Sequence, residues 1–175
     1  MSESPRTSVR ANARSGSDRE DAPMYDLVEL FFFAYRDFVG DADRLLEVYG
    51  FGRAHHRVLH FVSRHPGLTI AELLDILRIT KQSLNRVLKE LIATNFIDAR
   101  AGAYDRRHRQ LYATAEGAKL AHDLAQLQSR RFAGAVERLG PGGKERAAAF
   151  LLAMIDADER DHIIELIGAS PRRNP

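Results

Sequence analysis

The chain has 175 residues, of which 45% are hydrophobic and 29% are charged, and its formal net charge is +2. This composition predicts a water-soluble globular protein, because its longest apolar run, residues 30–35, is far shorter than the ~20 residues of a transmembrane helix. The chain contains no cysteine, which excludes disulfides, zinc–thiolate sites and thiol-based redox sensing. Without an apolar signal segment, we expect a cytoplasmic protein with no membrane partner.

The charge is distributed unevenly. Residues 78–109 contain eight basic and three acidic residues, a local net charge of +5, whereas the remainder of the chain carries −3. One basic segment on a mildly acidic protein indicates local contact with a polyanion such as nucleic acid. The basic residues are Arg78, Lys81, Arg86, Lys89, Arg100, Arg106, Arg107 and Arg109.

The N-terminal region changes character at Pro23. Residues 1–22 have almost no large apolar side chain, so they are predicted to form a disordered tail. From about residue 24 to about residue 49, apolar residues recur at spacings of three and four, which predicts a long amphipathic helix. Phe31, Phe32 and Phe33 cover more than one face of that helix, so we expect part of it to pack on a second subunit.

The next segment has the pattern of a helix-turn-helix. A helix around Val58 and Val62 ends at residues 65–67, and Thr69 with Glu72 fits a capping box that opens a short helix. A turn at residues 78–80 follows, and Thr80 suits the N-cap of another helix. The apolar residues predicted to form the buried stripe of that last helix are Leu84, Val87, Leu88, Leu91 and Ile92.

A β-hairpin is predicted directly after this motif. Asn95 can take the left-handed conformation that ends a helix, and residues 96–100 and 110–113 alternate with a period of two, as strands do. The hairpin tip between them is basic, which predicts a wing beside the helix-turn-helix. Beyond Thr114, one helix is expected to end at the glycines of residues 140–143, and a single last helix to continue to about residue 167, with a flexible C-terminus at 168–175.

The polar side of the second helix of the motif is predicted to read DNA. An α-helix fits the major groove, where Gln82 can pair with adenine and Arg86 with guanine. Wing arginines would bind phosphates or enter the minor groove. The alternative is a solvated helix face, which does not explain the basic wing that follows. The predicted DNA-binding residues are Thr80, Lys81, Gln82, Ser83, Asn85, Arg86, Lys89, Arg106, Arg107 and Arg109.

The histidines leave several interpretations open. His56 and His60 are four residues apart, with His55 beside them, a spacing that can place two imidazoles on one helix face. No HExxH motif or cysteine assists them, so a structural role competes with a metal site, a ligand pocket and pH sensing. The sequence has no GxSxG motif, phosphate-binding glycine loop or Cys–His pair. We therefore predict that the protein is not an enzyme and uses no metal or cofactor.

These segments together resemble a known family. Residues 56–97, continued by 105–120, are similar to the winged helix-turn-helix of MarR-type transcriptional regulators, and the resemblance covers roughly residues 25–167. Its most specific parts are residues 80–83, Arg86, the wing residues 105–107, and residues 114–117. In one respect the chain departs from the family pattern: residues 102–104 are Gly-Ala-Tyr where the family often has Asp-Pro-Arg, so one basic tip residue is missing.

The resemblance implies a mainly α fold with a small β-wing, in one domain over residues 23–167. Helices at about 24–49 and 115–167 would form a homodimer, and residues 53–113 would form the winged helix-turn-helix. It implies a repressor that binds a pseudo-palindromic operator in double-stranded DNA. Many family members dissociate from their operator when a small aromatic ligand binds to them. The ligand-binding residues remain unknown at this point. An activator, or a protein–protein interaction module that has lost DNA binding, remains the alternative.

Overall fold

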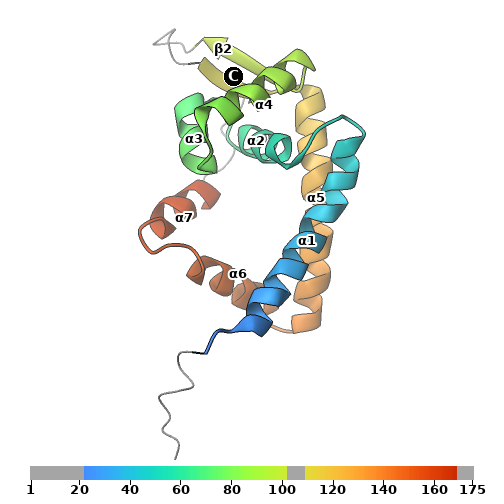
Figure 1. Ribbon diagram of the computed structural model, residues 1–175, viewed down its shortest axis with the longest axis vertical. Helices are drawn as coiled ribbons and strands as arrows, with labels where there is room; N and C mark the ends of the chain where they lie inside the picture. Colours follow the sequence, from blue (N-terminus) through green and yellow to red (C-terminus); the bar gives the residue numbers. More distant parts are fainter. Residues whose placement is uncertain (1–21, 102–108, 169–175) are drawn as a thin grey trace, which may run out of the picture. The chain divides into compact units, whose positions relative to one another are not determined.

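The computed structural model describes residues 22–101 and 109–168 (Figure 1). It confirms a mainly α fold with a small antiparallel sheet. The chain divides after Tyr35 into two units, so residues 22–35 and residues 36–168 are described separately below. The elements are α1 (Tyr25–Glu47), α2 (Arg53–Arg64), β1 (Leu68–Thr69), α3 (Ile70–Leu77), α4 (Lys81–Ala93), β2 (Ile97–Ala101), β3 (Arg109–Ala113), α5 (Ala115–Leu139), α6 (Gly143–Ala153) and α7 (Arg160–Gly168).

Helices α3 and α4 form the predicted helix-turn-helix. The capping box is present: the Thr69 hydroxyl accepts from the Glu72 backbone N–H at 3.2 Å, and the Glu72 carboxylate accepts from the Thr69 N–H at 2.7 Å. Helix α3 ends at Arg78, which takes the left-handed conformation with φ of 51°. Thr80 then caps α4 by accepting from the Ser83 backbone N–H at 3.2 Å. Local capping chemistry therefore defines both ends of the turn.

The sheet has one more strand than the sequence predicts. Strands β2 and β3 pair antiparallel as a hairpin, with Ile97 opposite Ala113 and Ala101 opposite Arg109. On the other edge, β1 pairs with β3 through Leu68 and Leu111, giving the order β1-β3-β2. The predicted left-handed conformation of Asn95 is confirmed, with φ of 63°. A two-residue strand is too short to show the period of two on which the prediction depended.

One core unites the helix-turn-helix, the sheet and parts of α1, α2 and α5. Its fully buried members include Leu46, Val58, Leu84, Leu111 and Leu124. The prediction for Ile92 is wrong: its side chain is 40% exposed. Leu84, Leu88 and Leu91 already form the buried stripe at spacings of four and three, and Ile92 lies at the edge of that stripe, one position past Leu91.

The start of α5 packs closely on the loop before the wing. Thr114 caps the helix by accepting from the Gly117 N–H at 3.0 Å, and its own hydroxyl donates to the Asn95 carbonyl at 2.7 Å. A Cβ atom at position 117 would lie 2.0 Å from the Phe96 carbonyl oxygen. Only glycine allows this approach. Residues 114–117 thus fix where α5 leaves the wing.

Further along, α5 contacts the second half of α1. The Arg131 guanidinium donates to Asp41 at 2.8 Å, and the rings of Phe38 and Phe132 meet edge to face with centroids 5.2 Å apart. The ion pair with Arg131 lowers the pKa of the Asp41 carboxyl. These contacts hold the two helices together beyond the main core.

The prediction of one continuous helix after residue 143 is wrong. The chain leaves helical geometry after Ala153, and α7 begins at Arg160. The Arg160 guanidinium donates to the Ala153 and Ile155 carbonyls at 2.9 and 2.8 Å, satisfying groups at the end of α6. Asp156 and Asp158 lie in the break, and aspartate is a poor residue for a helix interior. Figure 1 shows α7 beside α3 and α6 at the far end of α5.

The N-terminal unit consists of the first half of α1. Its large apolar side chains are exposed, including Leu30 at 62% and Phe32 at 64%, and the rings of Phe31 and Tyr35 stack with centroids 6.5 Å apart. In the described part of the chain, no helix combines the length and apolar character needed to cross a bilayer. The predicted tail (residues 1–21), the hairpin tip with Arg106 and Arg107 (102–108) and the C-terminal end (169–175) lie outside the described residues.

Candidate nucleic-acid interface

Helix α4 separates its apolar and polar residues onto two faces. Leu84, Val87, Leu88 and Leu91 are buried in the core. All the α4 residues predicted to contact DNA are exposed, together with the N-cap: Thr80, Lys81, Gln82, Ser83, Asn85, Arg86 and Lys89. The fold therefore presents the predicted polar face of α4 to solvent as one surface, which we call the α4 face.

The N-terminus of α4 is built for a negatively charged partner. Backbone N–H groups in the first turn of a helix lack partners within the helix and carry partial positive charge. Thr80 satisfies one of them through Ser83, and its hydroxyl also donates to the Ser83 Oγ at 3.0 Å. The first turn of α4 has no acidic residue. This end of α4 can therefore accept a phosphate group.

Not every basic residue of the segment 78–109 is available for such a partner. Arg78 donates to the Glu159 carboxylate at 2.6 Å, and this ion pair raises the pKa of the guanidinium. Arg100 lies 4.5 Å above the Tyr112 ring and 3.5 Å from Asp98. By contrast, the side chains of Lys81, Arg86 and Lys89 make no hydrogen bond or ion pair within the described residues. The local charge available to DNA is thus concentrated on α4.

The wing can be placed only at its base. Arg109 is exposed and opens β3 opposite Ala101. It therefore lies in the last pair of the hairpin, at the base of the segment that forms the tip. Arg106 and Arg107, the other predicted wing contacts, fall outside the described residues.

Comparison with known proteins identifies the family. The chain is 44% identical over 135 residues to the HTH-type transcriptional regulator PetP of Rhodobacter capsulatus, an alignment covering 77% of this chain and 81% of PetP. A MarR family model matches residues 49–108, which include the helix-turn-helix. The chain belongs to the MarR family of transcriptional regulators. The prediction of a regulator rather than an enzyme is thereby confirmed.

Solved structures of MarR-family proteins share the fold. A complex of Staphylococcus aureus MepR with DNA matches with a TM-score of 0.61 and 22% identity, covering 73% of this chain and 94% of MepR. The structure of MarR matches with a TM-score of 0.61 and 20% identity, covering 82% of this chain and 94% of MarR. At these identities the likeness establishes the winged-helix fold of this MarR-family chain.

An attachment of α4 to α2 was missed by sequence reasoning. The Gly52 backbone N–H donates to His55 Nδ1 at 3.1 Å, so the ring proton lies on Nε2, which donates to the Glu90 carboxylate at 2.7 Å. The His55 ring also stacks on Phe51 with centroids 4.8 Å apart. His55 therefore attaches the one acidic residue of α4 to α2. The partners are 35 residues apart, and only the fold brings them together.

His56 and His60 are partly buried on the following turns of α2. Burial lowers the pKa of both imidazoles, and the charge of His60 on His56, and of Arg64 and His65 on His60, act in the same direction. Among the residues that the structure describes, no three His, Cys, Asp or Glu side chains gather as metal ligands. The geometry thus favours a structural role for these two histidines.

Proposed function

We propose that this protein is a homodimeric repressor that binds a pseudo-palindromic DNA operator through α4 and the wing. The observation that carries the proposal is the α4 face, where Lys81, Gln82, Arg86 and Lys89 are exposed around a helix N-terminus without acidic residues. Arginine and glutamine are the side chains that pair bidentately with guanine and adenine in the major groove. The solved complex of MepR with DNA supports the same use of the shared fold.

Exposed apolar surface supports the homodimer. Tyr25, Leu30, Phe31, Phe32 and Phe33 in the first half of α1 are each about half exposed or more, and contiguous apolar patches of this kind mark protein interfaces. A second group, on the far half of α5 and on α6 and α7, consists of Phe132, Leu139, Phe150, Leu151, Met154, Ile164 and Ile167. We expect a second copy of the chain to cover both groups.

Two-fold symmetry would set the form of the operator. A symmetric dimer places two copies of α4 in successive major grooves, so the half-sites should lie about ten base pairs apart. A repressor of this kind acts in the cytoplasm by occupying a promoter, and release by a small-molecule ligand would provide its control. The wing arginines Arg106, Arg107 and Arg109 would add phosphate contacts beside α4.

A mobility-shift experiment tests the proposal. Purified full-length protein is mixed with DNA from around its own gene and with unrelated DNA of equal length, at two salt concentrations. We expect preferential binding to one fragment, with an apparent affinity that falls steeply as salt rises because several phosphates are neutralised. Equal binding to both fragments would contradict sequence-specific recognition, and absence of binding at low salt would favour the protein–protein interaction module.

The wing is tested separately from base reading. Arg106→Ala and Arg107→Ala should each weaken binding to all DNA sequences alike and reduce the slope of log affinity against log salt by about 0.9. Arg138→Ala, an exposed change in the last turn of α5, serves as a control of equal charge loss away from the wing. An unchanged affinity for unrelated DNA in the arginine variants would show that the wing does not contact phosphates.

A further inference from the structure

Glu90 is the one acidic residue of α4, and it lies four residues after Arg86. Side chains at this spacing are neighbours on a helix surface, so the Glu90 carboxylate is within reach of the Arg86 guanidinium. The other helix neighbours of Glu90 carry no charge, since they are Val87, Ala93 and Thr94. Arg86 and Glu90 are both exposed, yet their described side chains form no ion pair with each other.

The same spacing does form an ion pair on α5. Lys119 precedes Asp123 by four residues, and its ammonium group donates to the Asp123 carboxylate at 2.7 Å. The order of charges is the same on both helices, with the basic residue first and the acidic residue one turn later. The lack of a bond between the described side chains of Arg86 and Glu90 therefore requires a local cause.

The local cause is His55 on α2. Its Nε2 donates to the Glu90 carboxylate at 2.7 Å, and its Nδ1 accepts from the Gly52 backbone N–H at 3.1 Å. The ring stacks on Phe51 with centroids 4.8 Å apart and planes 12° apart, and Phe51 belongs to the buried core. The His55 side chain is 13% exposed. A donor that is already fixed in this way loses little conformational freedom when it binds Glu90.

The arginines of α2 that flank His55 are bound elsewhere. Arg53 donates to the Asp43 carboxylate at 2.7 and 3.0 Å. Arg57 donates to the Leu77 backbone carbonyl at 3.0 Å. The attachment of Glu90 to α2 therefore depends on the imidazole of His55.

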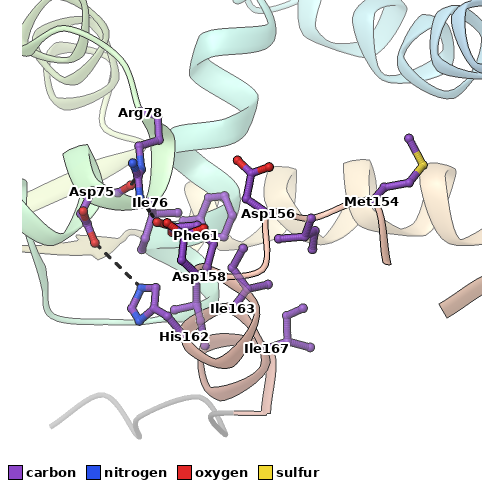
Figure 2. Close-up of a pocket in the computed structure, with 13 residues that line it drawn as sticks. Phe61, Asp75, Ile76, Arg78, Met154, Asp156, Asp158, His162, Ile163 and Ile167 are labelled. Atoms are coloured by element: carbon purple, nitrogen blue, oxygen red, sulfur yellow. Dashed lines mark hydrogen bonds and ion pairs between the residues drawn. The ribbon is translucent and has the colours of Figure 1, made fainter. Parts of the chain in front are cut away.

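Arg78 shows what a carboxylate within reach does to an arginine beside α4. It lies in the turn before α4 and lines a cavity together with Asp158 and Glu159 (Figure 2). Its guanidinium pairs with the Glu159 carboxylate at 2.6 Å, so it is committed to a contact within the chain. A released Glu90 would compete with DNA for Arg86 in the same way.

We propose that His55 is a positioning residue for DNA recognition, which keeps the Arg86 guanidinium available to a base by holding Glu90 against α2. An Arg86 paired with Glu90 would have to break that pair before it could bind guanine bidentately. Operator affinity and base preference would then both fall. The inference rests on the base-reading role proposed above for Arg86 and adds the residue that maintains it.

Four proteins test the proposal by fluorescence anisotropy: wild type, His55→Phe, Glu90→Gln and the double variant. Each is titrated with the operator and with an operator altered at the base pairs whose preference Arg86→Ala removes. Phenylalanine can still stack on Phe51 but cannot donate to Glu90. We expect His55→Phe to weaken operator binding by about two- to fivefold, the effect of one exposed ion pair, and to reduce the preference for the operator over the altered site.

The Glu90→Gln background distinguishes positioning from a purely structural role. Glutamine carries no charge to pair with Arg86, so the substitution His55→Phe should have no effect on operator affinity or base preference in this background. A loss of the same size with Glu90 and with glutamine at position 90 would show that His55 acts only through the fold of α2, and would overturn the proposal.

His56→Phe is the matched control. It makes the same substitution at the neighbouring partly buried histidine of α2, and any effect on operator binding should be the same with either residue at position 90. An effect of His56→Phe that also disappears with Glu90→Gln would overturn the specific role of His55. Circular dichroism checks the fold, and His55→Asn, which removes the imidazole without added bulk, takes the place of His55→Phe if that variant unfolds.

Arginine side-chain NMR measures the same contact without DNA. The Nε–Hε signal of Arg86 is identified by its absence in Arg86→Ala. We expect this signal to shift in His55→Phe and to return towards its wild-type position in the double variant, whereas an unchanged signal in His55→Phe would overturn the inference alone. If the signal shifts as expected but Arg86→Ala does not change base preference, the hold of His55 on Glu90 stands and the proposed base reading by Arg86 is wrong.

Discussion

Helix α4 and the first half of α1 are both amphipathic, but their apolar faces differ in how far the chain buries them. On α4, Leu84 and Leu91 are fully buried in the core of the same chain, and the large apolar side chain that reaches solvent is that of the edge residue Ile92. On α1, Leu30 and Phe32 remain more than 60% exposed. The comparison teaches that this MarR-family chain completes its helix-turn-helix by itself, whereas we infer that its N-terminal helix requires a second copy.

The fold should lose stability if the close packing of α5 against the loop before the wing is disturbed. Gly117→Ala would place a Cβ atom 2.0 Å from the Phe96 carbonyl oxygen, and relieving such an overlap should lower the free energy of unfolding by about 3 kcal/mol or more. Urea denaturation measures the change. Gly134→Ala on the same helix is the control, since its Cβ would meet only Arg138 at 3.9 Å. A loss of stability as large for Gly134→Ala would contradict the packing explanation.

The apolar face of α1 should matter for assembly rather than for the fold of the helix-turn-helix. Leu30→Ser with Phe32→Ser should raise the dissociation constant of the dimer by at least about a hundredfold, because each side chain loses about 1.5–3 kcal/mol of burial against a second copy. Sedimentation equilibrium measures the dissociation constant of the dimer. Thermal unfolding of the monomeric variant shows whether the helix-turn-helix remains folded. A wild-type protein that sediments as a monomer would contradict the inference that the N-terminal helix requires a second copy.

Substitutions on the exposed face of α4 should change DNA binding without changing the fold or the dimer. Arg86→Ala should cost about 1–3 kcal/mol of operator binding and relax base preference at one symmetric pair of positions. Lys89→Ala, a similar loss of charge on the same helix, is expected to weaken specific and non-specific DNA alike. Fluorescence anisotropy with operator variants distinguishes a loss of base preference from a general loss of DNA affinity. If Arg86→Ala lowers affinity for every sequence equally, Arg86 contacts phosphate rather than bases.

Acid should weaken the fold slightly through the partly buried histidines of α2. The pKa of His56 and His60 is lowered below the ordinary value of 6.5 by burial, so the unfolded chain binds protons at a higher pH than the folded chain. Stability should therefore fall as pH decreases from about 7 to 5. Tm measured across this range should fall less in a variant with His56→Asn and His60→Asn, and an equal fall in both proteins would contradict this origin.

Local chemistry explains which parts of the fold the sequence could predict. The capping residues Thr69, Thr80 and Thr114 act within four residues of themselves, and the buried stripe of α4 follows from helical periodicity, so the caps and four of the five predicted stripe residues, all but Ile92, were confirmed. The α6–α7 break was missed because apolar residues keep a helical spacing on both sides of Asp156. Strand β1 and the His55–Glu90 contact depend on partners far along the chain, which periodicity does not reveal.

The candidate DNA-binding site likewise has features that the sequence could predict and features that it could not. The exposure of the α4 residues could be predicted, because whatever is not on the buried stripe faces outward. The pairing of Arg78 with Glu159 could not, since 81 residues separate the two side chains and the break before α7 brings them together. As a result, the sequence counted Arg78 and Arg100 as available basic residues, whereas the structure commits both to contacts within the chain.

The central claim, that a dimer reads DNA through α4, is tested most directly by footprinting the operator with the wild-type protein and with Arg86→Ala. We predict two protected half-sites related by two-fold symmetry, about ten base pairs apart, and loss of the protected pattern in the variant at the same protein concentration. A single unsymmetric footprint, or an identical footprint with Arg86→Ala, would contradict it.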